Sequence, residues 1–589
     1  MRRTLLVVLA LGLPLLWMRA FVPSYTNDGA VVRWDLSGTN TLVHTNVVNR
    51  TTSAIRFFLA SDAYSATNTA AELNAVRASF GQWQAITGTW LKFEDAGLVN
   101  PPVDVSTADN TNVVYWTKST TIVNGGRDNI SGALGVAFTS FYSDGVLSEA
   151  DIVFNGVEFA WFTDFSDTNN AGRFVELVAL HEIGHFLGLQ HSPLGGAVML
   201  ARSAALPANA SGLSDDELGA ARWLYTSTPP LTNWAVLKGL VTKAGEGGVF
   251  GATITVEDAA GNAIAGTVTS TNGGTQGTYE IRSLPPGTFK VRVSPVDPFT
   301  ALALVSGADV SFDFLGADAN FLASTNFQVV LTAGLTNTLD VVVTNATPPF
   351  RISRVRPPTA NPLSYSLVNS PTSIRVGQSN MTVGVYSPDF TTNMTLSITG
   401  NGLSIGVTAF ETNLFTINGS AMHLLSVPLS VSSNATPGMR TFVVQRGTNI
   451  AYANGFIEVA PAVPDFNFDG LDDVFQRRHF PLFTATNAAP AADPDGDTFN
   501  NLAEYTSGTD PTNADSLLRI ETVRQDAAGC TITWQSGAGR RYQLTSKPLV
   551  ATGSFTNVGG PITATTNLTS VLDPSGTNGI AFYRVLALP

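Results

Sequence analysis

The spacing of apolar residues divides the chain into a mixed α/β region, from about 28 to 228, and a longer β-rich region. Between 70 and 86, Leu73, Phe80 and Trp83 recur at helical spacing, which predicts an amphipathic helix packed on a core. Short runs of apolar and β-branched residues predict strands in the same region. These predicted strands are 54–60, 112–116 and 149–155.

Two further helices are predicted in the α/β region. One runs up to Gly188, because glycine readily ends a helix. The other spans 214–225, where Ser214 followed three residues later by Glu217 forms a capping-box pattern. Helices and strands in the same region predict a mixed α/β domain.

The remaining chain alternates apolar and polar residues with period two and carries many glycine and proline turns, which is typical of β-sandwiches. Stretches such as TFKVRV and RRYQLTS show this pattern. An Asp-rich segment that lacks this alternation interrupts it. The predicted segments after the α/β domain are a β-sandwich at 233–346, an immunoglobulin-like β-sandwich at 350–460, Asp-rich repeats at 463–515 and a C-terminal β-domain at 517–589.

The first twenty residues have the layout of a secretory signal peptide. Arg2 and Arg3 precede an apolar stretch that ends near Trp17. We therefore expect 1–20 to direct export, so that the protein is secreted, periplasmic or on the cell surface. A membrane anchor is the alternative reading, although the stretch is short and contains Gly12 and Pro14. We expect no membrane span in the mature chain.

Charge and cysteine content narrow the possible partners. A formal net charge of −13 and no cluster of basic residues argue against binding to nucleic acid. The single cysteine, Cys530, cannot form an internal disulfide, and its apolar surroundings are typical of a small buried residue. Disulfides therefore do not stabilise this chain.

HEIGHFLGLQHS holds three of the six histidines. His181 and His185 are four residues apart, so on a helix both imidazoles can reach one ion. A left-handed Gly188 would turn the chain and bring His191 round as a third ligand. Three protein ligands leave one zinc position open for water, and Glu182 can act as the general base that hydrolyses a peptide bond. The alternative to a metal site is an ordinary helix that happens to carry histidines.

This pattern, with a methionine downstream, is the metzincin signature. The chain resembles the matrixins, the metzincin branch that contains the matrix metalloproteases, in VELVALHEIGHFLGLQHS, AVML and LSDDELGAARWLY. The resemblance covers about 30 to 226. It implies an α+β zincin fold, a catalytic Zn²⁺ on the three histidines, Glu182 as base and Met199 in the Met-turn beneath the metal. A core methionine is the alternative role for Met199.

Departures from the matrixin pattern concern latency and structural metals. No cysteine precedes Cys530, which excludes the family's cysteine switch, and His44 is the other histidine of this domain, which leaves the second zinc site without its ligands. Calcium could replace it, because acidic residues lie where the family binds calcium; turn and surface positions are the alternative. The calcium candidates here are Asp144, Asp151 and Asp164.

Two Asp-rich motifs follow the β-sandwiches. DFNFDGLDD places oxygen ligands at positions 1, 3, 5 and 9 of an EF-hand-type loop, but Gln476 replaces the glutamate at position 12. DPDGDTFNNLAEY resembles thrombospondin type 3 or dockerin-like repeats. A solvated acidic linker is the alternative to a structural Ca²⁺ site. The candidate calcium ligands are Asp465, Asn467, Asp469 and Asp473 in the first motif, and Asp493, Asp495, Asp497 and Glu504 in the second.

The sequence therefore predicts an exported zinc endopeptidase with accessory modules that acts on protein or peptide substrates. The stretch 233–346 resembles carboxypeptidase-regulatory-like, transthyretin-like modules in its GLV, GATITV and LPPGTFKV order. Such β-modules could bind cell-surface or matrix polymers. The second hypothesis is accordingly a surface or matrix adhesion protein in which the protease domain is secondary.

Overall fold

The computed structural model describes residues 4–7, 23–26, 29–37, 42–106, 109–167, 171–201, 212–226, 232–272, 275–297, 317–417, 419–548, 554–576 and 581–588. The chain divides into two compact units, Met1–Asn467 and Phe468–Pro589. The first unit contains the predicted α/β domain and two pairs of β-sheets.

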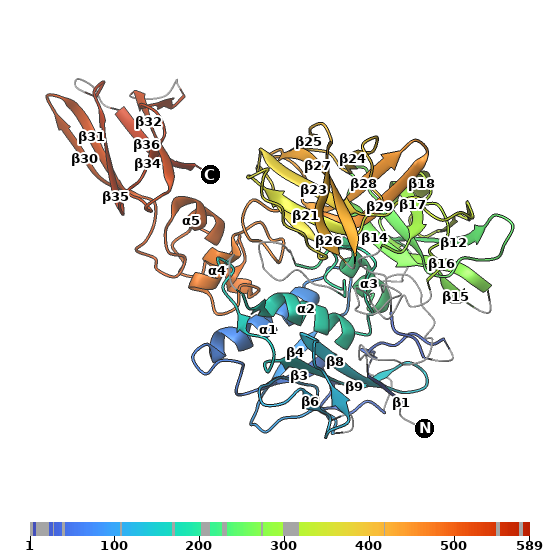
Figure 1. Cartoon of the computed structure of the whole chain (residues 1–589). Helices are drawn as coiled ribbons and strands as arrows, with labels where there is room; N and C mark the ends of the chain where they lie inside the picture. The colour runs from blue at the N-terminus through green and yellow to red at the C-terminus, as the bar shows by residue number, and fades with distance from the viewer. Residues whose placement is uncertain are drawn as a thin grey trace. The chain divides into compact units, whose positions relative to one another are not determined.

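The α/β domain is a mixed sheet with helices α1 and α2 on one face (Figure 1). Its strand order is β1-β8-β9-β5-β3-β2, and β4 also pairs with β3. β3, β4, β5 and β9 pair in parallel, whereas β8 runs antiparallel to β9. The bounds are β1 Thr4–Val7, β2 Val48–Asn49, β3 Ala54–Ala60, α1 Thr69–Gln84, β4 Phe93–Val99, β5 Val113–Thr117, β8 Gly135–Phe141, β9 Leu147–Asn155, α2 Val175–Phe186 and α3 Asp215–Leu224. Two short pairs complete it: β6 Ile122–Val123 with β7 Asp128–Asn129, and β10 Trp161–Phe162 with β11 Arg173–Phe174.

Each helix and strand predicted for this domain is confirmed, within a few residues at its ends. The periodicity succeeds because its apolar residues form the core between the helices and the sheet. Phe80 stacks on Phe57 at 4.0 Å between ring centroids, and Trp83 donates to the Leu180 carbonyl on α2. A fully buried side chain of this size contributes about 1.5–3 kcal/mol through apolar burial. The capping box of Ser214 and Glu217 is also present.

The strand β8 and the pairing of β1 were not predicted. Of the predicted signal peptide, the structure describes the four residues of β1, which pair antiparallel with β8. The rest of 1–20 lies outside the described residues.

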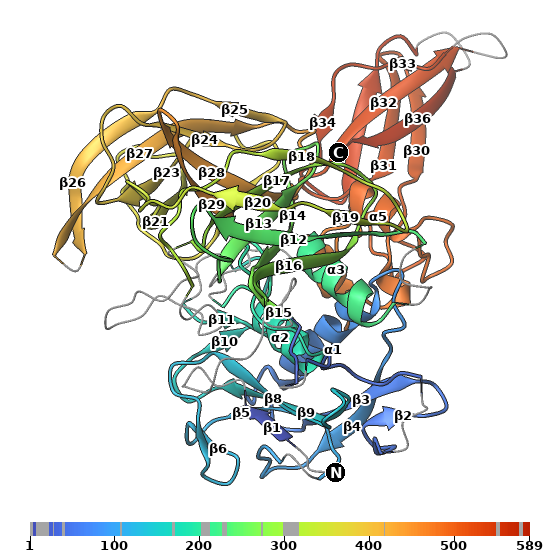
Figure 2. The same ribbon diagram turned by 90° about the vertical axis from the view of Figure 1, so that its right-hand side faces the viewer.

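The two β-sandwich regions of the first unit each consist of two sheets, in agreement with the predicted all-β modules (Figure 2). The first has sheets β15-β16-β12-β19, with β20 on β12, and β14-β13-β17-β18; the second has β21-β23-β27-β25, with β26 on β27, and β22-β29-β28-β24. Their bounds are β12 Ala235–Lys243, β13 Ala252–Glu257, β14 Ala263–Val268, β15 Ser270–Asn272, β16 Thr275–Leu284, β17 Gly287–Pro295, β18 Phe327–Leu331, β19 Thr336–Thr338, β20 Val341–Val343, β21 Arg354–Thr359, β22 Thr372–Arg375, β23 Met381–Ser387, β24 Thr395–Ile398, β25 Leu403–Ile405, β26 Ala409–Ile417, β27 Ser420–Val431, β28 Gly438–Arg446 and β29 Asn449–Ala460.

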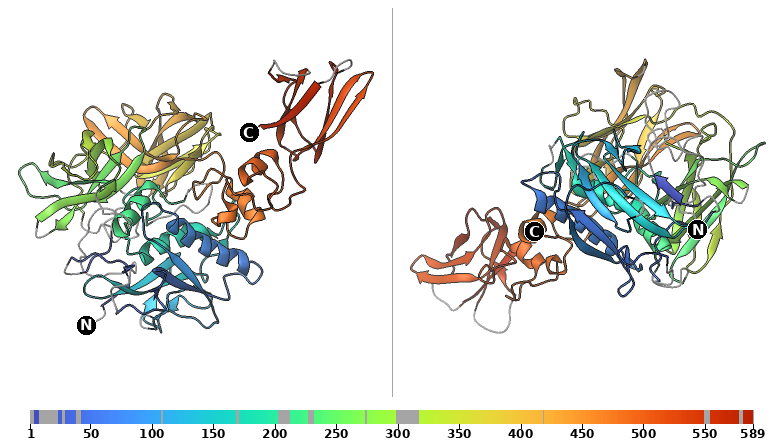
Figure 3. Two further views of the ribbon diagram at one scale, coloured as in Figure 1. Left: turned by 180° about the vertical axis from the view of Figure 1, so that it is seen from behind. Right: turned by 90° about the horizontal axis from the view of Figure 1, so that it is seen from below.

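The second unit joins short helices in the Asp-rich segment to two C-terminal sheets, which can be followed from other sides in Figure 3. The Tyr542 hydroxyl donates to the Ser507 carbonyl at 2.6 Å and so fixes the end of α5 to the sheets. The bounds are α4 Asp473–His479, the 3₁₀ turn η3 Thr486–Ala488, α5 Asn501–Ser507, β30 Ile520–Asp526, β31 Gly529–Gln535, β32 Arg541–Pro548, β33 Thr556–Asn557, β34 Ile562–Thr563, β35 Leu568–Asp573 and β36 Ala581–Leu588.

Within the described ranges, no helix combines the length and the apolar character needed to cross a membrane.

Candidate metal centre

The helix α2 carries the first two histidines of the site. The Nδ1 atom of His181 lies 2.8 Å from the Val198 carbonyl oxygen, and that of His185 lies 2.7 Å from the Leu189 carbonyl oxygen. Because a carbonyl oxygen can only accept, each Nδ1 carries the proton and each Nε2 presents its lone pair. The backbone carbonyls therefore hold both imidazoles in the tautomer that binds a metal through Nε2.

The chain turns back after α2 through Gly188. Its φ is +92°, and a Cβ atom there would lie 2.3 Å from the Val32 carbonyl oxygen. A left-handed backbone and this close approach both require glycine. The predicted turn is therefore confirmed, and it carries His191 back to the two helical histidines.

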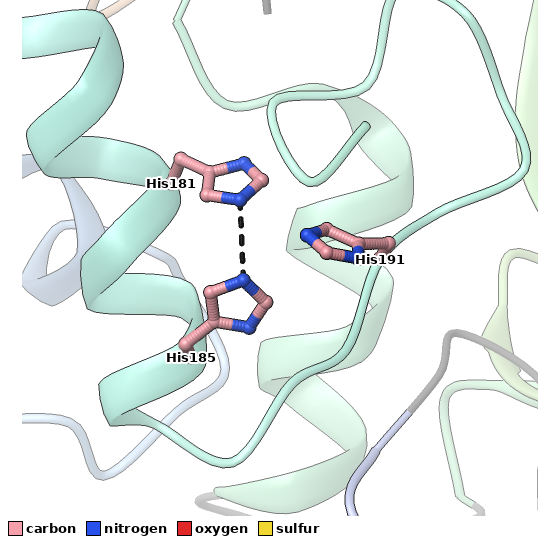
Figure 4. A group of neighbouring side chains, drawn as sticks. All are labelled: His181, His185 and His191. Atoms are coloured by element: carbon pink, nitrogen blue, oxygen red, sulfur yellow. Dashed lines mark hydrogen bonds between the residues drawn. The ribbon is translucent and has the colours of Figure 1, made fainter. Parts of the chain in front are cut away.

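Figure 4 shows the three imidazoles of His181, His185 and His191 facing one another. One ligand atom from each lies within 4.8 Å of the other two. The Nε2 atoms of the two helical histidines are 3.1 Å apart, and two lone pairs at that distance repel unless a cation lies between them. Nitrogens bound to one tetrahedral zinc ion stand about 3.3–3.4 Å apart. The donors and their spacing therefore fit zinc.

Glu182 lies on α2 between the two helical histidines and faces β8. The residue is only 4% exposed, and one carboxylate oxygen accepts a hydrogen bond from the Ala137 backbone, while Oε2 is buried and has no hydrogen-bond partner among the described residues. Burial raises the pKa of Glu182 to about 8. A cation on the neighbouring histidines would oppose this effect by favouring the carboxylate. A buried carboxylate with one unoccupied oxygen is suited to exchanging a proton with a bound molecule.

Sequence reasoning missed the strand that encloses Glu182. At Gly135, the first residue of β8, a Cβ atom would lie 2.9 Å from both Cγ and Oε1 of Glu182. The absence of a side chain at position 135 therefore gives the carboxylate its space. A glycine in a strand is a sequence signal of close approach, but it becomes informative only once the strand is known.

Met199 packs beneath the helix that carries the ligands. It is buried, and a Cβ atom at Gly184 would lie 2.1 Å from its sulfur, so the glycine between the two helical histidines accommodates the methionine. The Met199 amide donates to Glu217 Oε1 at 2.9 Å. Glu217, which belongs to the capping box of α3, therefore also holds the methionine in place. The sequence did not reveal this second role.

The three acidic residues expected to bind calcium in this domain lie in separate settings. Asp144 accepts from the Val146 amide in a turn, and Asp151 is buried in β9 with both oxygens bonded to backbone amides. Asp164 accepts from the amide and hydroxyl of Ser166. Among the described residues they do not gather as a ligand group. The structure therefore adds no support for calcium here.

The second Asp-rich motif does bring its carboxylates together. Asp493, Asp495 and Asp497 each place an oxygen within 4.8 Å of the others. Glu504 on α5 is fully buried, and in the described chain its carboxylate has at most a weak hydrogen bond, from the side chain of Thr509. Burial, together with the charges of Asp495 and Asp497, raises the pKa of Glu504 to about 7. Unpaired buried carboxylates of this kind are costly without a cation.

The first Asp-rich motif has a different arrangement. Its residues Asp465 and Asn467 end the first unit, whereas Asp469 and Asp473 begin the second. Asp469 accepts a hydrogen bond of 2.9 Å from the side-chain amide of Gln476. Gln476, which replaces the usual bidentate glutamate, therefore donates to Asp469, one of the candidate ligands. This contact makes the first motif the poorer cation site.

Residues 49–226 match the family model described as matrixin, a peptidase family. The matched part contains the three histidines, Glu182 and Met199. The match supports a matrixin-like domain of the metallopeptidase class within a longer chain. No curated protein matches the chain.

Solved structures with some similarity include pilins. They include the minor pilin GBS52 of Streptococcus agalactiae, with 10% identity, 20% of this chain and 48% of that chain covered and a TM-score of 0.13. The major pilin subunit BcpA of Bacillus cereus has 8% identity, coverages of 58% and 85% and a TM-score of 0.15. This chain thus spans about half the length of GBS52. TM-scores this low do not establish a shared fold.

Proposed function

We propose that this chain is an exported zinc-dependent endopeptidase of the metzincin type, which hydrolyses peptide bonds of extracellular proteins. The observation that carries the proposal is the convergence of His181, His185 and His191, with a backbone carbonyl holding the metal-binding tautomer of the first two. Glu182 stands beside them, and within the described part of the chain one of its buried oxygens has no hydrogen-bond partner. Structural histidines have no need of such an arrangement.

The three histidines would hold the zinc ion, which when bound supplies a Lewis acid that polarises water and the substrate carbonyl. Glu182 takes a proton from the attacking water and passes it to the leaving amine nitrogen. Burial of Glu182 against β8 keeps bulk water away from this proton transfer. Met199 supports the helix beneath the ligands.

The full chain should cleave casein or gelatin. Treatment with a chelator should abolish cleavage, and one equivalent of zinc should restore it, because the three histidines leave a zinc position open for water. Cleavage that persists after the metal has been removed would contradict the proposal. Absence of cleavage by a chain that carries bound zinc would favour the adhesion hypothesis, in which the β-modules are the main function.

The Asp-rich segment is proposed to bind calcium. The buried carboxylate of Glu504 and the cluster of Asp493, Asp495 and Asp497 support this for the second motif. Calcium takes six to eight oxygen ligands, several of them from carboxylates. Its role would be structural, because Ser507 at the end of the neighbouring helix α5 is bonded to the C-terminal sheets. Calcium titration by calorimetry, with Glu504→Gln as the control, tests this role.

Export by 1–20 is a further part of the proposal, and it rests on the arginine pair and apolar stretch of the sequence. N-terminal sequencing of the mature protein recovered outside the cell should show that these residues have been removed.

A further inference from the structure

The loop 192–199, which follows the third histidine, reaches two parts of the metal site. It begins directly after His191, and Ser192 donates from its amide to the Met199 carbonyl at 2.7 Å, which closes the loop. The Val198 carbonyl of the same loop accepts the hydrogen bond from His181 Nδ1. A shift of this loop would therefore move one ligand and release the ring orientation of another.

The tip of this loop lies against the second β-sandwich. The Gly195 amide donates to the Asn454 carbonyl on β29 at 2.8 Å. A Cβ atom at Gly195 would lie 2.5 Å from a ring carbon of Phe456, and one at Gly196 would lie 2.7 Å from Met439 Cγ. Both glycines thus contact the sandwich so closely that no side chain fits.

The first β-sandwich holds the same loop from β14. Leu194 is fully buried, and a Cβ atom at Gly266 would lie 2.5 Å from its Cγ. The Gly266 amide donates to Asp216 Oδ1 at 2.9 Å, and the Ser192 hydroxyl donates to Asp216 Oδ2 at 2.8 Å. Asp216 therefore links the residue next to a metal ligand with a strand of the first sandwich.

Asn454 connects these parts of the molecule. It is fully buried; its amide donates to Asp297 at 2.9 Å, its side-chain oxygen accepts from Arg292 at 3.1 Å, and its side-chain nitrogen donates to Ser294 at 3.2 Å. Those three residues belong to the first sandwich, whereas the Asn454 carbonyl receives the Gly195 amide. One residue thus joins the second sandwich, the first sandwich and the metal-site loop.

We infer that the two β-sandwiches are positioning elements of the metal site, which hold the loop 192–199 through Asn454 and the contact of Gly195 with Phe456. The inference rests on the proposed zinc site and deepens it. A module joined only by a flexible linker would leave the loop unsupported, whereas here the loop is buried between both sandwiches. Groups that orient metal ligands typically change metal affinity by about 10- to 100-fold when removed.

The experiment measures the zinc affinity of the full chain by competition with a chromophoric chelator. Gly195→Ala should weaken zinc binding by about 10-fold or more, because its Cβ atom displaces the loop from Phe456. Gly195→Ala combined with Phe456→Ala should recover part of that affinity, since the second change makes room. Gly247→Ala is the matched control, because a Cβ atom there meets nothing within 4 Å, and it should bind zinc like the parent.

Asn454→Ala adds no volume and keeps the backbone carbonyl, so it serves as a second variant if Gly195→Ala fails to fold. It should weaken zinc binding and speed hydrogen exchange of the amides in the loop 192–199, while those of α1 stay protected. Unchanged zinc affinity in folded Gly195→Ala and Asn454→Ala would overturn the inference. A parent chain that binds no zinc would instead overturn the proposed function.

Discussion

At the scale of single residues, the site depends on positions that lack a side chain as much as on its ligands. Gly184 makes room for Met199, and Gly135 makes room for Glu182. The sequence indicated the candidate ligands because a four-residue spacing places two histidines on one helical face. It could not reveal the glycines' roles, because these depend on which segments lie opposite them.

Gly135→Ala should lower kcat by about 10- to 100-fold, since a misplacement of about 1 Å in a catalytic group can cost about that much. The added Cβ atom would stand 2.9 Å from Glu182 Oε1 and push the carboxylate aside. Zinc content should stay unchanged, because the three atoms nearest the added Cβ all belong to Glu182 and not to a histidine. Steady-state kinetics beside a zinc assay checks this, and parental kcat would show that the carboxylate tolerates the shift.

At the scale of elements, periodicity predicted α1, α2, α3 and three strands of the sheet, but not β8. Nearly all of β8 is buried, so its run GVAFTSF has no alternation of apolar and polar residues to mark it as a strand. The sheet pairing on β9 determines its conformation instead. The strand beside the candidate base therefore could not be predicted from the pattern alone.

The second Asp-rich motif should give the second unit a pH-dependent stability. The pKa of Glu504 is raised to about 7 from an ordinary value near 4.5, so without calcium the folded state binds more protons than the unfolded state between these values. Stability should therefore fall as pH rises from about 4.5 to about 7. Calcium, which needs the carboxylate, should stabilise most above pH 7.

Thermal unfolding of the full chain at pH 5 and pH 8, with calcium or with chelator, measures this dependence. Calcium should raise the melting temperature of the second unit by about 5 °C or more at pH 8, and much less at pH 5. In Glu504→Gln both the calcium effect and the pH dependence should shrink. An equal calcium effect at the two pH values would contradict the assignment of Glu504.

At the scale of the whole molecule, the structure contains two β-sandwiches as predicted, but the sequence did not predict that both pack against the loop 192–199 of the metal site. Arg292 and Asn454 are 162 residues apart and hydrogen-bonded, and no local pattern encodes a contact of that kind. The first 467 residues form one compact unit. The sequence thus indicated the elements of each module, whereas packing between modules needed the structure.

The buried ion pair of the first sandwich should be important for stability, because its arginine also donates to Asn454 and Thr441 of the second sandwich. Arg292 bonds Glu257 at 2.9 Å with both side chains almost fully buried, so Arg292→Met leaves a buried charge with a poorer partner and should cost about 3–5 kcal/mol. The partly exposed pair of Arg77 and Asp95 provides the control, and Arg77→Met should cost about 0–1 kcal/mol. Denaturant unfolding of the full chain compares them. Equal losses would show that the buried network around Arg292 contributes no more to stability than a partly exposed ion pair.

The central claim is that Glu182 acts as the base beside a zinc ion held by the three histidines. Its most direct test compares peptide cleavage by the full chain and by Glu182→Gln at measured, equal zinc content. We expect Glu182→Gln to keep its zinc and to lose cleavage by about 100- to 10,000-fold, the usual contribution of a general base. Cleavage by zinc-loaded Glu182→Gln at the parental rate would contradict the mechanism.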